Sequence, residues 1–180
     1  MEKIGKILEN DTIILRKPEP EDLEFLFSLE NNPDYWFISD TRTPFSKWQI
    51  RQHIKNSIYD IYTNKELRLI IEQKSDTKQI GIIDLFDFDP IHSRAGVGIL
   101  INKEFQNKTY ASQALSLIIY YSAKVLKLNQ IWCNIDYDNI VSIKLFTKMG
   151  FVNCGHLKGW KNNGNSFSDV LIFQLFNNIK

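Results

Sequence analysis

The feature of this chain that most constrains its fold is a repeated change in the spacing of its apolar residues. Short β-branched runs indicate strands, and runs with apolar residues three and four apart indicate helices. Read in this way, the chain has the order β α α β β β α β α β β. Strands are expected at residues 12–16, 67–72, 79–88, 94–101, 130–135, 151–156 and 170–176. Helices are expected over 23–30, from Ser46, from Ala111 and up to Met149.

The segments between these elements are short, which predicts one domain over residues 1–180. Polar turns at 74–78 and 89–93 separate three successive strands and favour antiparallel hairpins. The segment 159–165, rich in Gly and Asn, is expected to join the last two strands. No repeat, low-complexity tract or linker interrupts the pattern. We therefore expect an α/β domain with a mixed, mostly antiparallel sheet of about seven strands flanked by about four helices.

Helix ends are marked by local signals. Ser46 and Gln49 form the sequence pattern of a capping box, with Phe45 placed to pack on the first turn. The inner face of that helix is expected to comprise Ile50, Ile54, Ile58 and Ile61.

The last helix is bounded by residues suited to its two ends. Asn139 or Asp138 is expected to cap its N-terminus. Gly150 follows Met149 and suits a left-handed residue that ends the helix. This ending would bring Phe151 against Phe146 across the turn.

Composition excludes several classes of protein. The chain has 22 Lys and Arg against 21 Asp and Glu, a net charge of +1, so a basic nucleic-acid surface or polybasic membrane patch is not expected. No apolar run approaches the roughly 18 residues of a membrane span, and the first ten residues lack the pattern of a signal peptide, so a soluble cytoplasmic protein is expected. Cys133 and Cys154 read as buried free thiols, and the scattered His residues predict no metal site.

The sequence motifs of dinucleotide enzymes, P-loop NTPases and serine hydrolases are missing. What remains is a polar loop, 102–112, that runs from a predicted strand into the N-terminus of a predicted helix. Free backbone N–H groups and the positive helix end attract anions, and Lys108 adds a charge. A plain connection between a strand and a helix is the alternative interpretation of the loop.

Two segments together resemble the GCN5-related N-acetyltransferase superfamily. The first is the strand-loop-helix from Ile99 to Ala111, and the second runs from Asn139 and Ser142 to Lys148, Gly150 and Phe151. The resemblance covers nearly all of residues 12–176 and is greatest to the branch of the ribosomal-protein N-terminal acetyltransferases and the spermidine acetyltransferases. It implies a sheet that splays between its fourth and fifth strands, with acetyl-CoA as acyl donor.

The resemblance also implies which residues hold the donor. In the family, the pantetheine arm lies along the fourth strand like an added strand, and the pyrophosphate sits on the loop and helix N-terminus. The residues at matching positions here are Ile99, Leu100, Ile101, Gln106, Asn107, Lys108, Thr109, Tyr110, Ala111, Ser112, Asn139, Ser142 and Lys148.

Four positions depart from the family pattern. Thr109 stands at a glycine position of the phosphate loop, and Asn107 replaces a frequent second glycine. The Thr109 side chain would either crowd the phosphate or act as an N-cap with its hydroxyl toward the anion. Phe146 and Gly96 stand where the spermidine enzymes carry a tyrosine general acid and a glutamate, and neither can transfer a proton.

An acceptor amine must lose a proton before it attacks, which calls for a carboxylate, a histidine or a water held by one. Asp84 is our first candidate for this base, with Asp136 or Glu30 as the alternatives and Asp87 also near the cleft. Ser142 is a candidate to assist the leaving thiolate, and a plain helix-cap role is the alternative for it. The acceptor itself is expected near the first helix and the loop after it. The candidate substrate residues there are Glu30, Tyr35, Trp36 and Asp40, beside Asp34 and Phe37. The alternative for the three aromatics is ordinary anchoring in the core, and the alternative for each acid is a solvated surface position.

Two functions are weighed from these residues. The first is an enzyme that transfers an acetyl group from acetyl-CoA to a primary amine of a polyamine, amino sugar, amino acid or protein N-terminus by direct attack. Neither cysteine is placed to form a covalent intermediate. The second is a catalytically weak or inactive module that binds or senses acyl-CoA, suggested by Thr109, Gly96 and Phe146. A small-molecule or peptide substrate and a monomer or homodimer are expected, without nucleic acid, membrane or metal.

Overall fold

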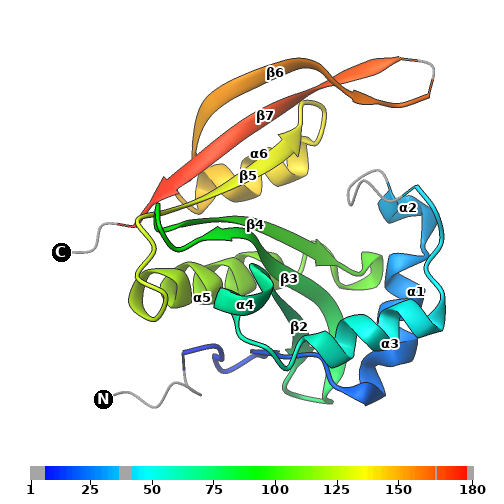
Figure 1. Ribbon diagram of the computed structural model, residues 1–180. Coiled ribbons are helices and arrows are strands. Elements are labelled where there is room, and N and C mark those ends of the chain that lie inside the picture. The colour runs from blue at the N-terminus through cyan, green and yellow to red at the C-terminus, as the bar shows by residue number, and fades with distance from the viewer. Residues whose placement is uncertain (1–6, 37–41, 165, 178–180) are drawn as a thin grey trace.

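The computed structural model describes residues 7–36, 42–164 and 166–177, and it contains one seven-stranded sheet (Figure 1). The strand order is β1-β2-β3-β4-β5-β7-β6. The strands are β1 Ile13–Arg16, β2 Leu67–Gln73, β3 Lys78–Asp89, β4 Arg94–Ile101, β5 Gln130–Asp136, β6 Val152–Asn162 and β7 Phe167–Phe176. All neighbouring strands are antiparallel except β4 and β5, which are parallel. The predicted mixed sheet is therefore confirmed.

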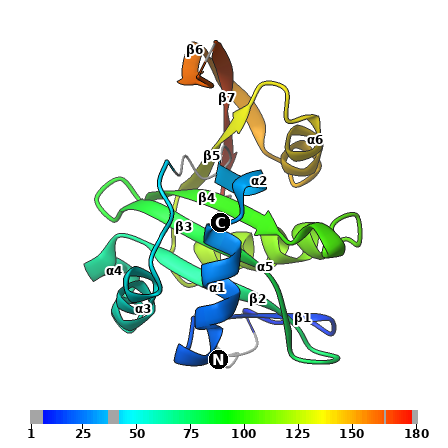
Figure 2. The ribbon, with the colours of Figure 1, turned by 90° about the vertical axis from the view of Figure 1, so that its right-hand side faces the viewer.

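Helices cover both faces of the sheet: α1 and α3 pack together on one side, and α5 and α6 share the core on the other (Figure 2). The helices are α1 Leu23–Glu30, α2 Pro33–Trp36, α3 Lys47–Asn56, α4 Ile61–Asn64, α5 Tyr110–Lys124 and α6 Ile140–Lys148, with two 3-10 helices, η2 Pro20–Asp22 and η3 Lys103–Phe105. The four long helices match the expected ones. The short ones were not expected, because a single turn leaves little periodic signal in the sequence.

The local end signals act as predicted. The Ser46 side chain accepts from the N–H of Gln49, and the capping box is complete. Gly150 has a φ of +92° at the end of α6, and the rings of Phe146 and Phe151 meet edge to face at 5.0 Å. The prediction that Ile58 and Ile61 belong to the inner face of α3 is wrong. The helix ends at Asn56, Ile58 is 70 % exposed, and Ile61 begins α4 and is buried in the core on the other face of the sheet.

The last hairpin is longer than expected. Residues 159–162 belong to β6, so the connection between the two strands is only 163–166. The register between β6 and β7 shifts between Leu157 and Lys161, which accommodates the extra residues as an irregularity in the ladder. Polar residues and Gly159 hid this part of the strand in the sequence.

Apolar side chains form a core on each side of the sheet. The larger core packs α5 and α6 against the sheet, and the alternate residues Ile131, Cys133 and Ile135 of β5 point into it. Burial raises the pKa of the Cys133 thiol to about 12, so this thiol is inert. The expectation that Cys154 is buried is wrong, because it lies exposed on the edge strand β6.

The sheet opens between β4 and β5. These strands pair only at residues 94–96 of β4, opposite residues 130–132 of β5. Beyond Gly96 the strands diverge, and β5, β7 and β6 rise away from β4 in Figure 1. The splay implied by the family resemblance is confirmed.

Candidate active site

A cavity of about 340 Å³ lies beside this opening. Its wall is made by the end of α1, by α2 and by one face of strands β2, β3 and β4. The lining residues are Leu29, Glu30, Tyr35, Glu66, Leu67, Arg68, Ile82, Asp84, Leu85, Phe86, Gly98, Ile99 and Leu100. Asp84 shares this lining with Ile82 and Phe86, as strand alternation predicts.

Arg68 of β2 joins two carboxylates in this cavity. Its Nε donates to Oδ1 of Asp84 at 3.0 Å and its Nη2 donates to Oδ2 at 2.9 Å, a bidentate pair between neighbouring strands. Its Nη1 donates to Oε1 of Glu30, the last residue of α1. Burial alone would lower the pKa of Arg68, but the attraction of Asp84 and Glu30 outweighs burial and raises this pKa above its ordinary value. Arg68 is therefore a permanent cation.

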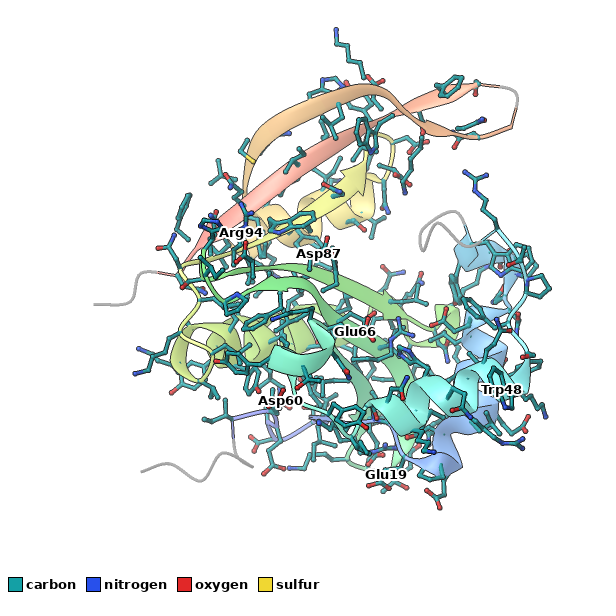
Figure 3. All side chains as sticks on the ribbon, in the orientation of Figure 1. Glu19, Trp48, Asp60, Glu66, Asp87 and Arg94 are labelled. Atoms are coloured by element: carbon teal, nitrogen blue, oxygen red, sulfur yellow. The ribbon has the colours of Figure 1, made fainter. Side chains whose placement is uncertain are left out.

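The cavity is nevertheless acidic. Glu30, Glu66 and Asp84 face a single arginine within the lining. Glu66 is half exposed, and the ion-pair partner found for it in the described chain is His53, whose Nδ1 lies 3.9 Å away. In Figure 3 the labelled Glu66 and Asp87 lie one above the other, with Asp87 nearer to β5. A half-exposed carboxylate such as Glu66 in the lining of an acidic cavity suits a cationic ligand.

Aromatic rings and glycines shape the end of the cavity near the opening. The Phe86 ring lies over Gly96, where a Cβ would approach the ring to 2.3 Å, and it meets the Trp132 ring edge to face at 5.3 Å. A glutamate at position 96 would therefore displace Phe86. At Gly98, which pairs with Asp84, an added Cβ would meet only Phe86, at 3.7 Å. Space thus remains beside Asp84 where the strands diverge.

The phosphate-loop positions have the backbone that glycine normally supplies. Asn107 has a φ of +61° and Thr109 a φ of +66°, both left-handed. A β-branched residue rarely takes this conformation. Thr109 is the N-cap residue of α5 and its side chain makes no capping hydrogen bond to the helix, so a contact of its hydroxyl with an anion stays a prediction. The N–H groups of Tyr110, Ala111 and Ser112 begin the helix.

One edge of β4 is open beyond Gly96. Residues 97–101 pair with β3 on one side and with no strand on the other within the described chain. Ile99 and Leu100 also line the cavity, while the Ile101 carbonyl accepts from Nε2 of Gln106 at 2.9 Å. An open strand edge followed by a left-handed loop and a helix N-terminus fits the extended arm and phosphates of coenzyme A.

The helix α6 follows β5 on the other side of the opening. Asn139 caps it, with Oδ1 accepting from the Ser142 N–H at 3.1 Å. Lys148 lies in its last turn, at the far end from Asn139. Phe146 is 4 % exposed and belongs to the large core.

The remaining candidate carboxylates lie outside the cavity. Asp136 at the end of β5 pairs with Nζ of Lys161 at 2.9 Å. Asp87 has a φ of +48° at an irregularity of β3 and is exposed. Asp34 is exposed on α2. Asp40 and Phe37 lie outside the described residues.

The two described aromatic candidates differ in position. Tyr35 lines the cavity, and its hydroxyl accepts from the Lys103 N–H at 3.1 Å, which joins α2 to the segment after β4. Trp36 does not line the cavity, and its indole N–H donates to the Glu30 carbonyl at 3.0 Å.

Sequence reasoning missed Arg68 and Glu66. The available signal was that the charged residues 66 and 68 alternate with the aliphatic residues 67 and 69. In a strand this alternation places both charged side chains on the same face of the sheet. Two further features concern the part of the chain that the structure describes. None of its helices combines the length and hydrophobicity needed to span a bilayer. No group of three or more His, Cys, Asp or Glu within it is placed to hold a metal ion.

Comparisons with known proteins agree with this geometry. The acetyltransferase (GNAT) domain model matches residues 12–152. A spermidine N(1)-acetyltransferase of Vibrio cholerae serotype O1 is 30 % identical over 151 residues, which cover 82 % of this chain and 83 % of the relative. The crystal structure of spermidine N-acetyltransferase from Vibrio cholerae with CoA and spermine matches with a TM-score of 0.82 at 27 % identity, covering 93 % of this chain and 97 % of that one. A dodecameric structure of the Vibrio cholerae enzyme matches with a TM-score of 0.78 at 28 % identity, covering 93 % and 95 %.

Proposed function

Because the chain belongs to the acetyltransferase (GNAT) family and is an acetyl-CoA-dependent N-acetyltransferase of small-molecule amines, we propose that its acceptor is an aliphatic amine with several positive charges, of the polyamine type. The observation that carries this proposal is the acidic cavity beside the opening of the sheet. The relatives named for spermidine acetylation support it.

Charge balance in the cavity favours a polycation over a singly charged amine. The lining has three carboxylates and one arginine, a formal net charge of −2, and His53 lies 3.9 Å from Glu66 just outside this lining. Attraction between opposite charges near a protein surface is worth a few kcal/mol at 4 Å, before desolvation is subtracted. A second ammonium group on the acceptor would therefore gain from Glu66 while the first lies near Asp84.

Asp84 remains our prediction for the residue that moves the amine proton. Arg68 uses one lone pair on each Asp84 oxygen, and each oxygen keeps another that can accept from a water or an ammonium. Through such a lone pair Asp84 can hold a water that takes the proton while the amine becomes neutral. The rate should rise with pH toward the pKa of the amine itself.

Bound acetyl-CoA supplies the thioester carbonyl that the neutral amine attacks. Backbone N–H groups of the open β4 edge are our prediction for the donors to the developing oxyanion. Ser142, in the first turn of α6, is our prediction for the hydrogen bond to the departing thiolate, while Asp136 pairs with Lys161 and is the second choice of base.

The location of the protein and its oligomeric state are also proposals. A cytoplasmic location and a monomeric or dimeric state stay predictions, and the dodecameric relative shows that this fold also forms larger assemblies. Light scattering coupled to size-exclusion chromatography would give the oligomeric state of this chain.

Acetyl transfer to a panel of acceptors tests the proposal. The panel contains spermidine, propylamine as the matched amine with one charge, glucosamine and a tripeptide with a free N-terminus. We expect kcat/KM for spermidine to exceed that for propylamine by at least about tenfold, the equivalent of one additional charge contact. Equal values, or a preference for the peptide, would contradict the polyamine proposal. Coenzyme A binding without transfer to any acceptor would favour the acyl-CoA-binding module.

A further inference from the structure

The side chains of Asn10, Gln113 and Thr109 form a chain of hydrogen bonds from the N-terminal segment to the start of α5. Which group donates and which accepts is fixed at the Asn10 end of this chain. Oδ1 of Asn10 accepts from the backbone N–H groups of Thr12 and Ile13, each at 2.8 Å. Backbone N–H groups are donors only, so the atom they meet must be the Asn10 oxygen. The Asn10 Nδ2 group is therefore the one that points away from this turn.

This orientation fixes the next amide. Asn10 Nδ2 donates to Oε1 of Gln113 at 2.9 Å, and the two residues lie 103 positions apart in the sequence. With its oxygen occupied in this way, Gln113 presents its Nε2 group to Thr109, at 3.0 Å from Oγ1. The orientations of the Asn10 and Gln113 side-chain amides therefore both follow from the two backbone N–H donors, those of Thr12 and Ile13.

The Thr109 hydroxyl is thereby left with its own proton to donate. A hydroxyl has one O–H and two acceptor lone pairs, and Gln113 uses a lone pair. Thr109 is exposed, and no acceptor for its proton is found in the described chain. The neighbouring Ser112 differs, because its Oγ donates to the Thr109 carbonyl at 2.8 Å. Of the two aliphatic hydroxyls at the start of α5, those of Thr109 and Ser112, only that of Thr109 has a proton to offer outside the helix.

We propose that Thr109 donates this proton to a phosphate of coenzyme A, and that Gln113, held by Asn10, is the positioning residue that turns the hydroxyl outward. The inference rests on the use of acetyl-CoA that family membership establishes. It explains how a threonine is accommodated where the family has a glycine. The left-handed backbone at Thr109 keeps the loop shape, and the hydroxyl adds a donor that glycine lacks.

Equilibrium binding of coenzyme A, measured by calorimetry without any acceptor, tests this inference. Thr109→Val keeps the shape and removes the hydroxyl, and we expect it to weaken coenzyme A binding about tenfold, as for a hydrogen bond to a charged group. Thr109→Gly removes the hydroxyl and relieves the backbone, and it should weaken binding to a similar extent. Thr109→Ser should restore most of the affinity.

Two comparisons separate a phosphate contact from a general effect on the fold. Pantetheine has no phosphate, so its affinity, measured by competition, should stay within about twofold in Thr109→Val. Ser116→Ala removes another hydroxyl of α5, one that donates to the Ser112 carbonyl, and serves as the matched control with coenzyme A affinity like that of the wild type.

The role of Gln113 is tested by a double-mutant cycle. Gln113→Leu should weaken coenzyme A binding in the wild type and have little further effect in Thr109→Val. Unchanged coenzyme A affinity in Thr109→Val, or an equal loss for pantetheine, would overturn the inference. A wild-type protein that binds no coenzyme A would contradict the assigned function itself, which distinguishes the two failures.

Discussion

Two clusters of one arginine and two carboxylates hold opposite ends of α1 to the sheet. At the start of the helix, Arg16 of β1 pairs with Asp22 and with Glu72. At the end of the helix, Arg68 pairs with Glu30 and Asp84. The two arginines have the same side-chain exposure, 23 %.

What separates the clusters is access. The carboxylate of Asp22 is 1 % exposed and accepts four hydrogen bonds, from Arg16 twice, the Glu19 N–H and Gln79. Glu30, Arg68 and Asp84 instead line the 340 Å³ cavity beside the opening of the sheet. The same ionic chemistry is thus structural where it is sealed and available for a ligand where it borders a cavity.

The largest expected effect is on catalysis at the open cluster. Asp84→Asn keeps the shape but removes the negative charge that we assign to proton removal. We expect kcat/KM for spermidine to fall by roughly ten- to a thousandfold. Initial rates on protein whose folding is verified by circular dichroism provide the measurement. If Asp84→Asn kept the wild-type rate while Asp136→Asn was inactive, Asp136 and not Asp84 would be the residue that removes the amine proton.

At the sealed cluster around Asp22, we expect a substitution to reduce stability and to leave activity nearly unchanged. Asp22→Asn leaves Arg16 without its best partner and breaks a largely buried ion pair, which costs about 3 kcal/mol of unfolding free energy. Urea unfolding measures this loss. The folded variant should keep the wild-type kcat/KM within about twofold, and a fall comparable to that of Asp84→Asn would contradict the division between the clusters.

Acid should weaken the sealed cluster. Burial pushes the pKa of Asp22 up, but the hydrogen bonds from Arg16 and the Glu19 N–H outweigh burial and hold this pKa below its ordinary value. The unfolded chain therefore binds this proton more readily than the folded protein. The contribution of Asp22 is complete above about pH 4 and is lost as the pH falls through the lowered pKa.

Unfolding free energies of the wild type and Asp22→Asn, measured from pH 7 downward, should therefore converge at low pH. A constant difference between the two proteins would show that the carboxylate charge is not the source of the stabilisation.

The smallest effect is expected for an exposed ion pair that joins α1 to α3. Glu24 is 71 % exposed and pairs with Lys47 at 2.6 Å. Exposed ion pairs contribute about 0–1 kcal/mol, so Glu24→Gln should change stability by less than about 0.5 kcal/mol and leave kcat/KM unchanged. A larger loss would mean that α1 depends on charge along its whole length.

Local signals made much of the fold predictable from the sequence. Capping at Ser46 and Asn139 and the left-handed Gly150 each depend on residues a few positions apart, and all three are as expected. Ile58 misled the prediction because continued apolar spacing hides the end of a helix. The first choice among the carboxylates, Asp84, does line the cavity, since strand alternation fixes its face.

The partners of Asp84 could not be predicted in the same way. Its pairing with Arg68 depends on the register between β2 and β3, and its link to Glu30 depends on how α1 lies over the sheet. Similarly, the Asn10–Gln113 contact joins segments 103 residues apart. Tertiary packing sets these contacts, and single-sequence patterns carry no signal for them.

The most direct test of the cavity as the acceptor site is calorimetric binding of spermidine in the presence of coenzyme A, which cannot donate an acetyl group. Glu30→Gln removes a negative charge from the cavity, while Asp22→Asn removes one from the sealed cluster at the other end of α1. The account predicts about tenfold weaker spermidine binding in Glu30→Gln and a change of less than about twofold in Asp22→Asn. Unchanged binding in Glu30→Gln, or equal losses in the two variants, would contradict it.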